Sequence, residues 1–128
     1  MKDDEFLSLF EDCSLPKEQF KHKEHLRVAW LYLSKYNFDQ AMKHITQGIN
    51  RYANCVGAGH IYHETLTRVW VFLVNNELYP KAESFDKFIK KKQHLLNKDL
   101  PLEYFSKERL DSEQARKQWI APDLKRLM

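Results

Sequence analysis

The sequence predicts an all-α fold, a single-domain bundle of about five to six helices joined by short loops. Apolar residues recur at the spacing of amphipathic helices along most of the chain. The chain contains only 3 Gly and 4 Pro, and this scarcity of turn residues disfavours a many-stranded sheet. Its 128 residues suit one domain and no long linker divides them, so we expect one domain over residues 1–128.

Two helical patterns open the chain. In residues 3–11, the apolar side chains of Phe6, Leu7 and Phe10 share one face. Residues 21–36 continue with a longer apolar stripe at helical spacing. The inward face expected for this second helix consists of His25, Ala29, Tyr32, Leu33 and Tyr36.

The third helix is expected over residues 39–56. Asn37 ends the helix before it, Asp39 is a candidate N-cap, and Gly57 lies just beyond its end, where glycine commonly stops a helix. Its predicted apolar stripe consists of Ala41, Met42, Ile45, Gly48, Ile49 and Tyr52.

The fourth helix, over residues 61–76, contains the apolar run VWVFLV at residues 69–74. A helix that is apolar all round is typical of a central, buried position. The run also fits a buried strand, but the length of the segment and its helical neighbours favour a helix.

Two further helices are expected over residues 81–97 and 111–119, with Ser106 and Asp111 as candidate N-caps and Pro122 beyond the end. The first of them should turn Phe85, Phe88, Ile89 and Leu96 inward. Its expected outward face carries Lys87, Lys90, Lys91 and Lys92.

Charge and composition narrow the function classes. A net charge of +3 is too mild to indicate a nucleic-acid-binding protein. The longest apolar run is far shorter than a membrane span, and the chain opens with acidic residues instead of a signal peptide. We therefore expect a cytoplasmic protein that does not enter a membrane, with Cys13 and Cys55 as reduced thiols.

A His-Glu pair opens the fourth helical pattern, in the stretch HIYHETLTRVWVFLV of residues 60–74. A zinc-protease motif would need a second histidine four residues after His63, and Thr67 stands there instead. That motif is therefore excluded. The structural interpretation makes His63 a hydrogen-bonded residue near the start of a buried helix. It pairs Glu64 with Arg68 in an i,i+4 salt bridge worth about 0.2–0.5 kcal/mol.

The functional interpretation adds His25, a second histidine on an apolar stripe. If the second and fourth helices pack together, His25 and His63 would converge. With the carboxylate of Glu64 or Glu24 they would hold a divalent metal ion with open coordination positions. The same residues would alternatively line a metal-free polar pocket, as acid-base or binding groups.

Arg116, in the segment SEQARKQW, is a candidate clamp for an anion. The alternative is a surface salt bridge with Glu113 or Asp123, because exposed arginines commonly form such weak pairs.

Three segments, FKHKEHLRVAWLYL, YHETLTRVWVFLV and SEQARKQWIAPD, resemble a family of small uncharacterised bacterial helical proteins. That family has F-x-H-x-x-H-L early, K-Y-H-E-T-hydrophobic-T in mid-chain, and S-x-x-A-R followed by P-D. The resemblance covers residues 20–123 and departs at Ile61, where the family has a basic residue. It implies a helical fold and no particular activity. The resemblance also implies one candidate set of polar site residues, namely His22, His25, Tyr62, His63, Glu64, Thr67, Arg116 and Asp123.

Three functional hypotheses follow. The first is binding of a small molecule or a divalent metal ion at an inward His/Glu cluster between the second and fourth helices, with or without catalysis. Its candidate metal ligands are His25, His63 and Glu64, and its further binding residues are Tyr62, Thr67 and Arg116.

The second hypothesis is an interaction or homodimerisation module without catalytic activity. It is favoured by a tetratricopeptide-like hairpin over residues 25–53 and by a high content of aromatic residues. The third, nucleic-acid binding through Lys87, Lys90, Lys91, Lys92 and Lys98, is disfavoured by the mild net charge.

Overall fold

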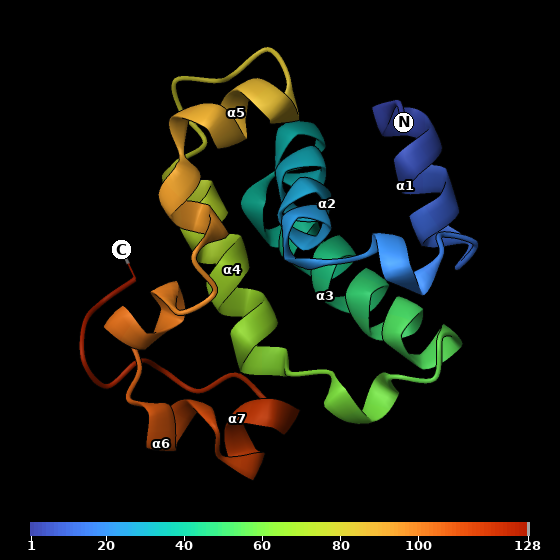
Figure 1. Ribbon diagram of the computed structural model, residues 1–128. Helices are drawn as coiled ribbons and strands as arrows, with labels where there is room; N and C mark the ends of the chain where they lie inside the picture. Colours follow the sequence, from blue (N-terminus) through green and yellow to red (C-terminus); the bar gives the residue numbers. More distant parts are fainter. Residues whose placement is uncertain (128) are drawn as a thin grey trace. The chain divides into compact units, whose positions relative to one another are not determined.

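The computed structural model describes residues 1–127, and within this range the fold is all-α (Figure 1). Seven α-helices and four short 3-10 helices account for its regular structure, and these residues form no strand. The predicted fold class is therefore confirmed. The contacts divide the chain into two compact units, Met1–Tyr62 and the residues from His63 onward. The prediction that both belong to one domain stays a prediction.

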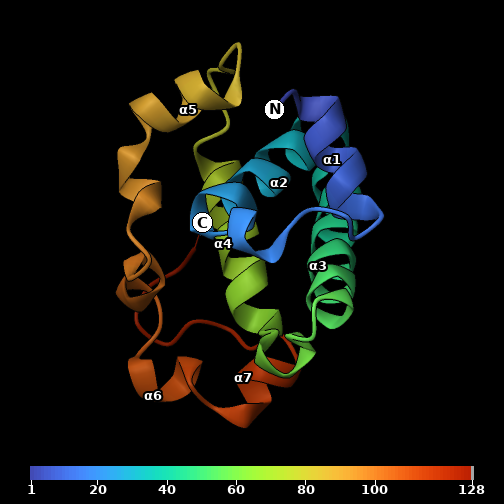
Figure 2. The ribbon, with the colours of Figure 1, turned by 45° about the vertical axis from the view of Figure 1, so that its right-hand side comes forward.

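The first unit contains three longer helices and two 3-10 turns. These are α1 (Asp3–Glu11), η1 (Lys17–Gln19), α2 (His22–Lys35), α3 (Phe38–Cys55) and η2 (Gly59–Ile61). Both α1 and α2 pack against α3, and the two ribbon views show α1 alongside α3 (Figures 1 and 2). A Cβ atom on Gly48 of α3 would lie only 3.0 Å from a ring carbon of Phe10, which shows how closely α1 approaches α3.

The predicted boundaries in this unit agree closely with the observed ones, with two corrections. The N-cap of α3 is Asn37, whose side chain accepts a hydrogen bond from the Gln40 amide, and not Asp39. Tyr36 is exposed and not inward, because it stands just after the last residue of α2 in extended backbone. The apolar stripe of α3 is buried as predicted, and Gly57 adopts a positive φ of 78° where the helix ends.

The two cysteines require a larger correction. Cys13 and Cys55 are joined by a disulfide, with their Cα atoms 6.2 Å apart, and so are not the reduced thiols expected from the sequence. Their spacing of 42 residues matches no redox or metal motif. Only the packing of α1 against α3 brings the loop after α1 to the end of α3.

The second unit is built on α4 (Glu64–Asn76), which confirms that the VWVFLV run is helical. Short helices follow: α5 (Phe85–Lys91), η3 (Gln93–Leu96), η4 (Leu100–Glu103), α6 (Lys107–Leu110) and α7 (Glu113–Lys117). The helices η4 and α7 contact α4, and Figure 1 shows α7 next to the first turn of α4. Among residues 1–127, no helix is both long enough and apolar enough to cross a membrane.

The last two predicted helices are shorter than expected. The segment 81–97 forms α5 only from Phe85, because Ser84 caps it by accepting a hydrogen bond from the Lys87 amide. The helix ends at Lys91, so the register changes and Leu95 is buried while Leu96 is exposed.

Within the segment 111–119, only α7 (Glu113–Lys117) is helical. Ser106 caps α6 as predicted, but the cap of α7 is Ser112 and not Asp111.

Candidate functional site

The predicted site residues are divided between the two units. His25 and Tyr62 belong to the first unit, whereas His63, Glu64, Thr67 and Arg116 belong to the second. The convergence of His25 with His63 therefore stays a prediction. Within residues 1–127, no three His, Cys, Asp or Glu side chains form a group that could hold a metal ion.

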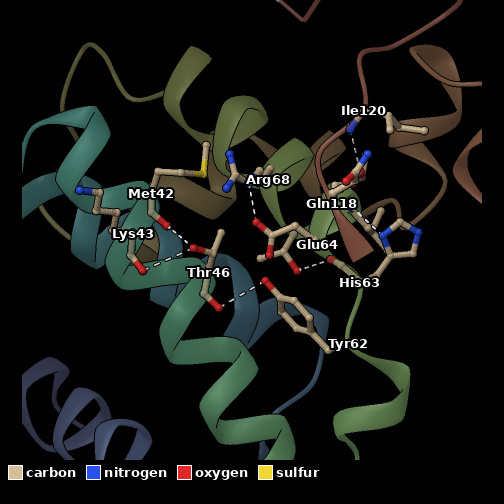
Figure 3. Close-up of polar contacts among 12 residues, drawn as sticks. Met42, Lys43, Thr46, Tyr62, His63, Glu64, Arg68, Gln118 and Ile120 are labelled. Atoms are coloured by element: carbon tan, nitrogen blue, oxygen red, sulfur yellow. Dashed lines mark hydrogen bonds and ion pairs between the residues drawn. The ribbon is translucent and has the colours of Figure 1, made fainter. Parts of the chain in front are cut away.

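His63 lies immediately before α4 and is its N-cap (Figure 3). Its Nδ1 atom accepts a hydrogen bond from the Leu66 amide at 3.0 Å, and its Nε2 atom lies 2.7 Å from the carbonyl oxygen of Leu110. A carbonyl oxygen can only accept, so Nε2 carries the proton. Both ring nitrogens are thus engaged within the second unit, in agreement with the structural interpretation of this residue.

Thr65 is a polar residue that sequence reasoning missed. Its side chain is fully buried, and its hydroxyl donates to the carbonyl oxygen of Gln118 at 2.7 Å and accepts from the amide of Ile120 at 3.1 Å. The only sequence signal was its place inside the Y-H-E-T segment, two residues after His63. Thr65 therefore ties the first turn of α4 to the chain that leaves α7.

Two contacts of this segment are local to α4, and the first of them was predicted. Arg68 donates from Nε to a carboxylate oxygen of Glu64 at 2.6 Å, which confirms the expected i,i+4 salt bridge. The Thr67 hydroxyl donates to the carbonyl oxygen of His63 at 2.7 Å. Both contacts stabilise the first turns of the helix.

Asp123 and Arg109 hold the segment after α7 to α6. The Asp123 carboxylate accepts hydrogen bonds from the Ser106 amide at 2.8 Å and the Ser106 hydroxyl at 2.7 Å. These bonds to the Ser106 side chain and backbone lower the pKa of Asp123. Arg109 donates to the Ala121 carbonyl oxygen at 2.7 Å. Asp123 therefore has a structural role here.

Arg116 has neither of the two salt-bridge partners expected for it. Glu113 lies 3.8 Å from Lys117, and Asp123 binds Ser106. Arg116 is half-buried on α7, and its side chain makes no hydrogen bond or ion pair with any other residue in the range 1–127. Of the predicted binding residues in the second unit, it is the one with an uncommitted charge.

His25 differs from His63 in how its ring is held. Its Nδ1 atom lies 2.7 Å from the carbonyl oxygen of Lys21, one turn earlier, and so must carry the proton. In the neutral ring Nε2 then has the lone pair. Glu24, the alternative carboxylate partner, accepts from the Lys21 amide at 2.9 Å and thereby caps the helix.

The ring of Phe20 connects His25 to an aromatic cluster of the same unit. The Phe20 ring lies 4.1 Å from the His25 ring, centroid to centroid, and also contacts Tyr52 at 4.6 Å and Phe10 at 5.4 Å. The Tyr52 hydroxyl donates to the Leu15 carbonyl oxygen at 2.6 Å. His25 is half-buried beside this cluster.

Tyr62, the remaining predicted binding residue, donates its hydroxyl to the Thr46 carbonyl oxygen on α3 at 3.3 Å (Figure 3). This long contact joins the end of the first unit to α3.

A second polar cluster lies around Tyr32, which the sequence predicted only as part of the inward face of its helix. The Tyr32 hydroxyl donates to the Glu11 carboxylate at 2.8 Å, and the His44 ring stacks on Tyr32 at 5.3 Å and on Tyr36 at 4.4 Å. Burial, together with the hydrogen bond to Glu11, raises the pKa of Tyr32. Tyr32 is therefore a neutral hydrogen-bond donor at physiological pH.

No family model, curated protein or solved structure matches this chain. Its function is therefore inferred from the geometry of its own side chains.

Proposed function

We propose that the protein binds a divalent metal ion or a small molecule, with His25 as the primary ligand residue. The observation that carries this proposal is the contact between Nδ1 of His25 and the Lys21 carbonyl oxygen. Such a contact fixes the ring orientation and the proton on Nδ1, as is usual for histidines that ligate metals. The aromatic ring of Phe20 supports the imidazole from one side.

His63 and Glu64 are weaker candidates than the sequence suggested. A metal ion on His63 would require loss of its hydrogen bond to Leu66 or to Leu110, and Glu64 already binds Arg68. Breaking one such bond leaves a backbone group unpaired, which costs about 1–3 kcal/mol if the group stays buried. The proposal therefore depends first on His25.

Metal analysis tests this proposal directly. Protein purified without chelator or polyhistidine tag should take up zinc, manganese, nickel or iron when the ion is supplied in excess. The His25→Ala variant should lose that metal. The matched control is His44→Ala, which removes an exposed imidazole of the same unit and should retain it. The His63→Ala variant should retain the metal but unfold at a lower temperature, because α4 loses its cap.

A metal-free protein that takes up none of these ions would contradict the metal proposal. Small-molecule binding at the same histidine would then be tested by titrating candidate ligands while recording the imidazole NMR signals of His25. A ligand that leaves those signals unchanged does not bind there.

We also propose that the second unit binds an anion through the side chain of Arg116. Its half-buried guanidinium lacks an internal partner within residues 1–127, and arginine binds carboxylate and phosphate in a two-pronged geometry. Inorganic phosphate should raise the melting temperature of the wild type and not that of the Arg116→Gln variant. Arg109→Gln is the control, since Arg109 is already bound to Ala121. Equal stabilisation of the wild type and the Arg116→Gln variant would exclude this role.

The alternative proposal is a protein-interaction or homodimerisation module. It is supported by large apolar side chains at the surface, since Tyr79 is 75% exposed, Ile61 63% and Leu124 60%. An elution volume on gel filtration that changes with concentration would favour it, and a monomer at every concentration would oppose it. We further propose that the protein acts in the bacterial cytoplasm, without contact to nucleic acid or membrane.

A further inference from the structure

We infer that the Cys13–Cys55 disulfide, here named the clasp, is reversibly reduced and reoxidised. Its redox state controls how firmly Phe20 is held against His25. The inference rests on the proposed function, because it assigns a regulation to the same histidine. In a reducing cytoplasm, disulfides are mostly transient and serve redox sensing or catalysis. A clasp of this kind would therefore respond to the redox state of the cell.

The segment from Ser14 to Phe20, here named the strap, begins next to the disulfide. Leu15, which is 2% exposed, is its buried anchor, and the Tyr52 hydroxyl donates to the Leu15 carbonyl oxygen at 2.6 Å. At its far end, the Phe20 ring lies 4.6 Å from Tyr52 and 4.1 Å from His25. The strap thus runs from the covalent bond at Cys13 to the ring that supports the proposed ligand.

Both ends of the strap depend on the last turns of α3. Tyr52 and Cys55 are three residues apart on this helix and therefore lie near one face. One residue holds the strap through a hydrogen bond and a ring contact, and the other through the disulfide. Loss of the disulfide removes the covalent attachment and leaves the weaker contacts of Tyr52.

The two sulfur atoms differ in accessibility. Cys55 is exposed, whereas Cys13 is half-buried. An attacking thiolate should therefore bond to Sγ of Cys55 and expel the Cys13 sulfur.

A dithiol, either a small molecule or a reducing protein, completes this reaction. Its first thiolate forms a mixed disulfide with Cys55 while the Cys13 sulfur leaves with the bonding electron pair and takes up a proton. Its second thiolate then attacks the first sulfur of the dithiol and releases Cys55, which is protonated in turn. The protein disulfide gains two electrons and two protons, and the dithiol becomes a disulfide.

Hydrogen exchange measured by mass spectrometry tests the clasp without any ligand. The full-length oxidised protein is compared with protein reduced by dithiothreitol, and with a Cys13→Ser/Cys55→Ser variant that cannot form the bond. Amides of the strap should lose protection in both the reduced protein and the variant. Amides of α4 serve as the internal reference and should keep their protection.

Three outcomes would overturn the inference. One is a strap that exchanges equally in the oxidised and reduced forms. Another is a pair of cysteines that stay reduced under oxidising buffer, as counted by alkylation. The third is a disulfide that dithiothreitol cannot reduce in the folded protein.

A titration with Zn²⁺ separates this inference from the proposed function. If His25 binds the ion, the oxidised wild type should bind it with a different affinity from the Cys13→Ser/Cys55→Ser variant, which has no thiols that could bind zinc themselves, and equal affinities would overturn the regulation. If neither form binds Zn²⁺ or any other tested ion, the metal proposal fails. The exchange experiment would still show whether the clasp operates.

Discussion

At the scale of single residues, the Y-H-E-T segment shows how polar side chains within an apolar sequence can be structural. The Thr65 hydroxyl satisfies two backbone groups, and the His63 ring satisfies two more. These bonds join the start of α4 to three backbone groups that are more than 40 residues away, since the sequence separations are 47, 53 and 55. The same residues attract attention as a site because buried polar groups are uncommon.

The Thr65→Val substitution tests this interpretation. Valine keeps the shape but leaves the Gln118 carbonyl and the Ile120 amide without the hydroxyl, so the free energy of unfolding should fall by about 2–4 kcal/mol. The control is Thr67→Val, whose hydroxyl binds only a carbonyl oxygen of its own helix and which should cost clearly less. Urea titration measures both, and equal costs would show that Thr65 has no special role.

The hydrogen bond between Tyr32 and Glu11 leads to a prediction at high pH. The folded protein raises the pKa of Tyr32 above its ordinary value of 10.0, so the unfolded chain loses this proton first. The stabilisation is therefore complete below about pH 10 and is lost as the pH rises above it. The Tyr32→Phe variant should lose less stability than the wild type between neutral and strongly alkaline pH. Parallel losses in thermal melts of the two proteins would contradict the prediction.

At the scale of elements, capping residues decide where the helices begin. Asn37, Ser84, Ser106 and Ser112 each accept a hydrogen bond from a backbone amide in the first turn of the following helix. Ser106 was predicted as a cap from the sequence, whereas Ser84 and Ser112 were overlooked. In the segment 81–97 the apolar spacing continues past the end of α5, so this helix was predicted too long, and the helix predicted over 111–119 was also too long because its cap is Ser112.

The disulfide provides a prediction about the first unit. It closes a loop with a sequence separation of 42 residues. For a loop of this length the chain-entropy relation predicts a stabilisation of about 4 kcal/mol. Reduction, or the Cys13→Ser/Cys55→Ser substitution, should lower the free energy of unfolding by about that amount at most. Urea titrations with and without dithiothreitol measure it, and dithiothreitol should leave the double variant unchanged.

At the scale of the whole molecule, two compact units are present within a chain that was expected to be one domain. The first unit ends at Tyr62 and the second begins at His63, inside the Y-H-E-T segment. A chain of roughly 60 residues buries only about 60% of the surface that its unfolded form exposes, so each unit would be marginal alone.

Two fluorescent probes can test the single-domain prediction. Trp30 lies in the first unit, and Trp70 and Trp119 lie in the second. The Trp30→Phe variant and the Trp70→Phe/Trp119→Phe variant would each report on one unit. Each reporter's urea midpoint should coincide with the circular dichroism midpoint of the same variant, as expected for one cooperative domain. If the fluorescence midpoint lies below the circular dichroism midpoint in one variant and above it in the other, the two units are separate domains.

The sequence by itself determined the fold class and the main helices of this protein. Periodic apolar residues and scarce glycine and proline are local signals, and they predicted α1, α2, α3 and α4 nearly to their ends. The Glu64–Arg68 pair was predictable for the same reason, because its partners are one helical turn apart.

Only the tertiary structure decided the roles of the polar residues. The second ring nitrogen of His63 is engaged by the carbonyl oxygen of Leu110, which is 47 residues away. Cys13 is oxidised because Cys55, which is 42 residues away, lies beside it in the fold. Contacts between residues so far apart leave no periodic signal in the sequence, because they arise only when separate helices pack together.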